Sequence, residues 1–129
     1  MFLLIELFCD IYIYLCFFSG IRAARKAYES LCRQPPTSLE FHKKMVMLEL
    51  VQPETMPKYV RQPYEVATTH FGANDTSIWL DYIMYEMKHG DPKRASNIHE
   101  RAVKMLDRSL TYSFIQDYSL LAAKPDSIK

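Results

Sequence analysis

The chain has 129 residues, of which 49% are hydrophobic and 24% charged, a composition that suits one folded domain and excludes general disorder. Its formal net charge of +1 excludes a whole-protein field strong enough to attract nucleic acid. The glycines, Gly20, Gly72 and Gly90, are too far apart to form a Gly-rich phosphate loop, which excludes nucleotide-binding fingerprints of that type.

Residues 1–19 differ in composition from the rest, because they are apolar or Tyr except for Glu6, Asp10 and Ser19. Three interpretations stay open. The segment is long enough for a short membrane span, although the two carboxylates would lie inside it. A second interpretation is a cleaved signal peptide. It is the weakest of the three, because the segment lacks a positively charged N-terminal region and a small-residue cleavage site. The segment could instead form a helix packed on the body that follows.

After residue 20 the apolar residues recur at helical spacing, and Gly and Pro fall between the helical stretches. The pattern predicts helices over about 21–32, 37–51, 56–71, 77–89, 92–106 and 109–123, with a frayed tail at 125–129. Thr37 and Glu40 have the spacing of a capping box, and Asp91 followed by Pro92 is typical of a helix start. Gly72 is expected to end its helix in a left-handed conformation.

These helices repeat in pairs. The segments 24–31, 60–67 and 95–102 align at offsets of about 35 residues, with an aromatic residue or His followed by Glu at equivalent positions. The segment 42–49 aligns in the same way with 79–86. A two-helix unit of this length is typical of a helical solenoid, in which antiparallel hairpins stack because one hairpin cannot bury its own apolar stripe. We therefore expect an all-α solenoid over residues 20–124.

Two segments carry a family resemblance: Trp-x-x-Tyr-Ile-x-x-Glu at 79–86 and Ala-x-x-x-x-Glu-Arg-Ala at 95–102. They resemble the half-a-TPR (HAT) motif of RNA-processing proteins. The run from residue 20 to about 124 is more closely similar to the C-terminal part of the U3 small nucleolar RNA-associated protein 6 family. The similarity to this family lies in four stretches: AYESLCRQPPTS at 27–38, HFG at 70–72, WLDYI at 79–83 and ERAVKML at 100–106. Residues 1–19 show no such resemblance.

The resemblance implies a right-handed superhelical solenoid of HAT/TPR-like hairpins. It also implies a nucleolar, non-enzymatic scaffold of the small-subunit processome, acting in U3 snoRNP-dependent ribosomal RNA processing and small-subunit maturation. Its partners would be processome proteins, with U3 snoRNA and pre-rRNA contacted mainly indirectly. Two alternatives stay open: a membrane-tethered helical adaptor that uses residues 1–19, and an inactive truncated copy.

Trp79, Tyr82 and Glu86 share one helix face and are the first candidates for a site. They could anchor a partner, since Trp and Tyr often dominate interfaces. The favoured interpretation is that they form the core between hairpins, with Glu86 accepting a hydrogen bond from the next helix, because they are framework positions of the repeat. The full set of repeat-framework positions is Tyr28, Glu29, Glu49, Tyr64, Glu65, Trp79, Tyr82, Glu86, Ala95, Glu100 and Ala102.

Basic residues suggest a second candidate surface on the helix that begins near Pro92. Lys93, Arg94, Arg101, Lys104 and Arg108 are candidates for contact with RNA phosphates or a partner, or they form an ordinary solvated face.

No motif supports catalysis, a cofactor or a small-molecule substrate. The four His residues are scattered, His99-Glu100 lacks the second His of a zinc-protease helix, and the three Cys form no CxxC pair. We therefore expect no metal site, no cofactor and no enzymatic activity.

Overall fold

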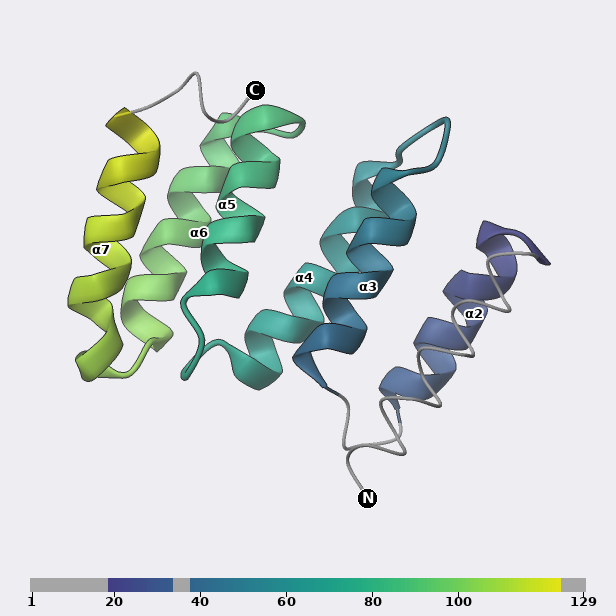
Figure 1. Ribbon diagram of the computed structural model, residues 1–129, viewed down its shortest axis with the longest axis horizontal. Helices are drawn as coiled ribbons and strands as arrows, with labels where there is room; N and C mark the ends of the chain where they lie inside the picture. Colours follow the sequence, from purple (N-terminus) through teal and green to yellow (C-terminus); the bar gives the residue numbers. More distant parts are fainter. Residues whose placement is uncertain (1–18, 34–37, 124–129) are drawn as a thin grey trace. The chain divides into compact units, whose positions relative to one another are not determined.

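The computed structural model describes residues 19–33 and 38–123 of the chain (Figure 1). Within these residues all regular structure is α-helical, as the periodicity predicted. The helices are α2 (Ile21–Cys32), α3 (Leu39–Leu50), α4 (Pro57–Phe71), α5 (Ser77–Lys88), α6 (Pro92–Met105) and α7 (Arg108–Ala123). The expected segments at 1–19 and 125–129 lie outside the described residues, except for Ser19.

Local hydrogen bonds explain where the helices begin. Asp91 Oδ1 accepts from the backbone N–H of Lys93 at 3.0 Å, and Pro92 follows it at the first helical position, which confirms the predicted start of α6. In α3 the cap is Ser38, whose Oγ accepts from the backbone N–H of Phe41 at 3.1 Å. The prediction of Thr37 as the cap was therefore wrong by one residue.

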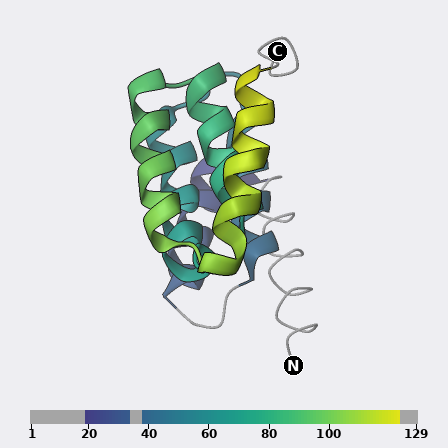
Figure 2. The same ribbon diagram turned by 90° about the vertical axis from the view of Figure 1, so that its left-hand side faces the viewer.

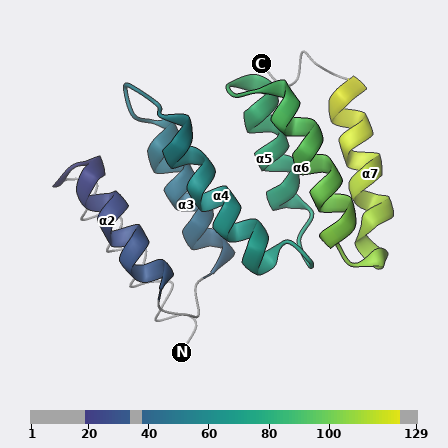
Figure 3. The same ribbon diagram turned by 180° about the vertical axis from the view of Figure 1, so that it is seen from behind.

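Of the described residues, those up to Tyr64 form one compact unit, and those from Glu65 onward form a second. In the first unit, α2 and α3 form an antiparallel hairpin (Figures 1 and 3). The ring of Tyr28 stacks on that of Phe41 with centroids 5.2 Å apart, and Met45 completes this buried cluster. The hydroxyl of Tyr28 also lies 2.8 Å from Nδ1 of the buried His42. Burial of each large side chain contributes about 1.5–3 kcal/mol to the unit.

In the second unit, α5 and α6 form an antiparallel hairpin, and α7 packs against both. Figure 2 shows α6 and α7 side by side. The predicted stripe of α6 is buried, and it is made of Ala95, Ile98, Ala102 and Leu106. His99, at a position where the other repeats carry Tyr, lies against aromatic rings of α7, with centroids 5.4 Å from Phe114 and 4.2 Å from Tyr118.

Gly72 was predicted to end its helix in a left-handed conformation, and that conformation is wrong. Gly72 does follow the last residue of α4, but the positive-φ residue in the described chain is Gly20, at φ 108°, which precedes α2. A Cβ on Gly72 would instead collide with the carbonyl oxygen of Thr68 and lie 2.7 Å from Cζ2 of Trp79. Gly72 is therefore required by close packing and not by backbone conformation.

Candidate functional site

Most of the framework positions are buried in the helical units. The side chains of Tyr28, Glu49, Tyr64, Trp79, Tyr82, Glu86, Ala95 and Ala102 are buried, whereas Glu65 is half-buried and Glu29 and Glu100 are exposed. A buried Trp, Tyr or Glu cannot meet a partner without local opening. The surface available for recognition is therefore made of other residues.

Trp79 lies at the centre of the second unit and is fully buried. Its indole N–H donates to the carbonyl oxygen of Gly72 at 2.7 Å, so the polar edge of the ring is satisfied inside the protein. This bond ties α5 to the end of α4. Trp79 is thus placed as a core residue that holds two helices together.

Glu86 is buried at the end of α5 and caps the beginning of the next helix. Its Oε2 accepts from the backbone N–H of Asp91 at 2.9 Å. Gly90 lies against this carboxylate, because a Cβ there would collide with Oε2 and lie 2.9 Å from Cδ. The turn between α5 and α6 is therefore organised around the carboxylate of Glu86.

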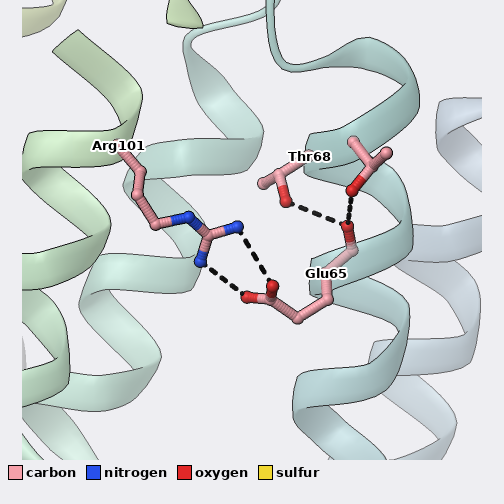
Figure 4. Close-up of polar contacts among 4 residues, drawn as sticks. Glu65, Thr68 and Arg101 are labelled. Atoms are coloured by element: carbon pink, nitrogen blue, oxygen red, sulfur yellow. Dashed lines mark hydrogen bonds and ion pairs between the residues drawn. The ribbon is translucent and has the colours of Figure 1, made fainter. Parts of the chain in front are cut away.

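A two-point ion pair joins α4 to α6 at a half-exposed position (Figure 4). The two terminal nitrogens of Arg101 each donate to one carboxylate oxygen of Glu65 at 3.0 Å. The guanidinium also lies 5.7 Å from the ring centroid of Trp79. The backbone carbonyl of Glu65 accepts from the hydroxyls of Thr68 and Thr69 at 3.1 and 2.8 Å.

This pair sets the ionisation of Glu65. Partial burial acts to raise the pKa of Glu65, but the hydrogen bonds from Arg101 and Tyr82 lower it, and the net direction is down. The pKa of Tyr82 is raised, first by burial and then by its hydrogen bond to Glu65. Arg101, one of the candidate phosphate contacts, is therefore engaged with a carboxylate of the same unit.

The remaining basic candidates are exposed. Lys93, Arg94, Lys104 and Arg108 all lie at the surface of α6 or at the start of α7. The structure thus separates the predicted group: Arg101 is paired with Glu65 at a half-exposed position, and no ion pair is shown for the other four within the described residues.

The first unit contains a second two-point ion pair, which the sequence analysis missed. Arg25 Nε and one terminal nitrogen each donate to Glu49 at 2.8 Å, and Glu49 is fully buried. The guanidinium also stacks on Tyr59 of α4, 3.6 Å from the ring centroid. The signal that could have indicated such a pair is the alignment of Glu49 with Glu86, since a framework Glu that becomes buried requires a cation or hydrogen-bond donors nearby.

Two other features concern the described residues alone. Within 19–33 and 38–123, no group of three or more His, Cys, Asp or Glu side chains is placed to hold a metal ion. None of the described helices has the length and apolar character needed to cross a bilayer. The candidate membrane segment at 1–19 lies outside this search apart from Ser19.

Comparison with known proteins places these helices in a family. The family model described as the C-terminal region of U3 small nucleolar RNA-associated protein 6 matches residues 5–106. The match begins at residue 5 and so includes most of the 1–19 segment, whereas we had placed the start of the resemblance at Gly20.

Two curated relatives carry the same description. The U3 small nucleolar RNA-associated protein 6 homolog of Mus musculus is 34% identical over 103 residues, and that of Homo sapiens is 32% identical over 103 residues. Each alignment covers 78% of this chain and 17% of the relative, so the chain spans about a sixth of the length of these proteins. On the strength of the family match over most of its length, the chain belongs to the U3 small nucleolar RNA-associated protein 6 family, in its C-terminal region.

Proposed function

We propose that this chain is a protein-binding scaffold of the small-subunit processome, acting in U3 snoRNP-dependent ribosomal RNA processing in the nucleolus. The observation that carries the proposal is the family match over residues 5–106, together with relatives that are named for association with U3 small nucleolar RNA. Its role is binding and not catalysis, and its partners are processome proteins. U3 snoRNA and pre-rRNA are reached mainly through those proteins.

The mechanism we propose is recognition by the outer surface of stacked hairpins. Residues 20–124 would form a right-handed HAT-type solenoid, a class of fold that offers an extended surface to partner helices or strands. Two features support this: the hairpins α2–α3 and α5–α6, and the burial of most of the framework residues. Such a stack depends on neighbouring contacts, and the ion pairs Arg25–Glu49 and Glu65–Arg101 each join two helices.

The N-terminal segment is proposed to belong to the same repeat region. The family match begins at residue 5, which favours a packed segment over a membrane span for residues 1–19. The carboxylates of Glu6 and Asp10 favour the same choice, since a central Asp in a span costs about 2.5–3.5 kcal/mol.

The test is affinity purification of the tagged full chain from cells, with imaging of its location. We expect recovery of processome proteins and a nucleolar signal, both retained after RNase treatment because the contacts are with proteins. Pelleting with membranes after carbonate extraction, without processome proteins, would instead support the membrane-tethered adaptor. A folded chain that recovers neither would be the inactive copy.

A surface variant tests the direct RNA contacts separately. Lys93, Arg94, Lys104 and Arg108 would each be replaced by Glu, and the control would replace exposed Lys26 and Lys58 by Glu. Loss of ultraviolet crosslinking to RNA in the first variant alone would show that α6 touches phosphates. Equal crosslinking in both would assign these residues to an ordinary solvated face.

A further inference from the structure

An open groove of about 400 Å³ lies between α5 and α7, within the second unit. Its apolar lining comes from Leu80 and Met84 of α5 and from Leu120 and Leu121 of α7. These side chains are not in the buried core, and Leu120 is 60% exposed. The volume is within the range of natural binding sites, about 300–1,000 Å³.

Each wall of the groove is formed by residues of one helix. Leu80 and Met84 are four residues apart on α5, and Asp117 and Leu121 are four residues apart on α7. The two helices run in the same direction, as the colours of Figure 1 show. Two helical ridges with an apolar furrow between them accept the apolar face of a third helix.

The charge of the groove selects its occupant. Asp81 and Asp117, both exposed, are among the residues that line it, and none of the lining residues within 19–33 and 38–123 is a Lys or Arg. Interfaces are arranged so that potentials of opposite sign meet, and like charges facing each other suppress the wrong partner. The occupant must therefore bring cations beside its apolar residues.

This requirement argues against two occupants that the chain itself could supply. A second copy docked groove to groove would place the same carboxylates of both copies opposite each other, because a two-fold interface uses the same patch twice. Residues 1–18 are apolar enough, but their charged side chains are Glu6 and Asp10, and they contain no Lys or Arg. Both would bring further negative charge to Asp117.

We propose that the α5–α7 groove is the docking site for an amphipathic helix of a partner protein, with apolar residues at three- and four-residue spacing flanked by Lys or Arg. This proposal rests on the scaffold function proposed above and names the chemistry of one of its partners. Leu120 and Met84 contact the apolar face of that helix, and Asp117 holds its cations.

The test uses the full chain and two synthetic fluorescein-labelled peptides, measured by fluorescence anisotropy. One peptide carries leucines at helical spacing flanked by lysines, and the other carries glutamates in place of the lysines. Four variants of the chain are compared: Asp117→Lys and Leu120→Ser in the groove, and Glu100→Lys and Tyr112→Ser as controls. The controls make similar changes at exposed positions of the same unit that do not line the groove.

We expect the lysine peptide to bind the natural chain and to lose at least roughly tenfold in affinity to each groove variant, but not to either control. The glutamate peptide should bind the Asp117→Lys variant better than it binds the natural chain. Equal binding of the lysine peptide to the natural chain and to Asp117→Lys would overturn the proposal. So would self-association of the natural chain that Asp117→Lys abolishes, because a second copy would then occupy the groove.

This experiment separates the groove from the scaffold function. A chain that recovers processome proteins equally with and without Asp117→Lys, and shows no groove-dependent peptide binding, lacks this docking site but keeps the proposed function. A chain that binds the lysine peptide as expected but recovers no processome protein has the groove and lacks the proposed function.

Discussion

Trp79 and Gly72 lie so close together that residue 72 has no room for a side chain. The indole N–H of Trp79 donates to the carbonyl oxygen of Gly72 at 2.7 Å, and a Cβ on Gly72 would lie 2.7 Å from ring atom Cζ2. The hydrogen bond needs the glycine backbone close to the ring, and that closeness excludes a methyl group. The end of α4 and the beginning of α5 are thus held together at one contact.

Replacing Gly72 by Ala should therefore destabilise the protein. The added methyl group must displace either the Trp79 ring or the backbone of Thr68, and overpacking of this kind costs about 1–3 kcal/mol. Urea unfolding followed by Trp fluorescence measures the change in free energy, since Trp79 is the only Trp of the chain. Asn74→Ala, at an exposed position in the same turn, should stay within about 0.5 kcal/mol of the natural chain. Equal stability of the two variants would contradict the packing argument.

Replacing only Arg25 of the Arg25–Glu49 pair should lower the free energy of unfolding more than replacing both residues. Arg25→Met leaves the fully buried carboxylate of Glu49 without its two donors from Arg25, and we expect a loss of roughly 3–5 kcal/mol in unfolding free energy. The double variant Arg25→Met, Glu49→Leu should recover most of that loss, because two apolar side chains need no charge compensation. Arg22→Ala, an exposed Arg of the same helix, serves as the control. Chemical denaturation of the four proteins checks the order, and a double variant less stable than the single one would refute it.

The Glu65–Arg101 pair should make stability depend on acid pH. Because the pKa of Glu65 is lowered in the folded protein, the pair's contribution is complete above the unfolded pKa of about 4.3 and is lost as the pH falls through the folded pKa. Both side chains are nearly half exposed, so the contribution is only about 0.2–1 kcal/mol.

The measurement is the difference in unfolding free energy between the natural chain and Glu65→Gln. This difference should shrink as the pH is lowered from 7 toward 3, and it should also shrink when salt is raised, because screening weakens exposed pairs. A difference that grows on acidification would show that the sign of the pKa shift is wrong.

The cap of α6 gives a prediction that is independent of packing. Asp91→Ala removes the carboxylate that accepts from the backbone N–H of Lys93, and this should cost about 0.5–2 kcal/mol. Asp91→Ser keeps an acceptor oxygen at the same place and should restore most of the stability. Thermal unfolding followed by circular dichroism distinguishes them, and equal melting temperatures for the Ala and Ser variants would exclude a capping role.

The residues that could be placed from the sequence are those whose role is local. The bounds of α2 agree with the prediction at both ends, and α4 through α7 each differ by one residue at one end, since helical spacing and capping residues act over one or two turns. The cap of α3 was misplaced because Thr37 and Ser38 are adjacent, and both side chains can cap. The buried stripe of α6 was found for the same local reason.

By itself, the sequence determined the helices, their pairing with a period of about 35 residues and the family. Each of these can be recognised from short-range patterns of residues. The tertiary structure alone decided that Arg25 pairs with Glu49, that Arg101 pairs with Glu65, and that Gly72 is needed for its lack of a Cβ. It also brought Leu80 and Leu120, forty residues apart in the chain, to the walls of one groove. Such relationships depend on distances across space between helices, and helical spacing within one segment holds no information about them.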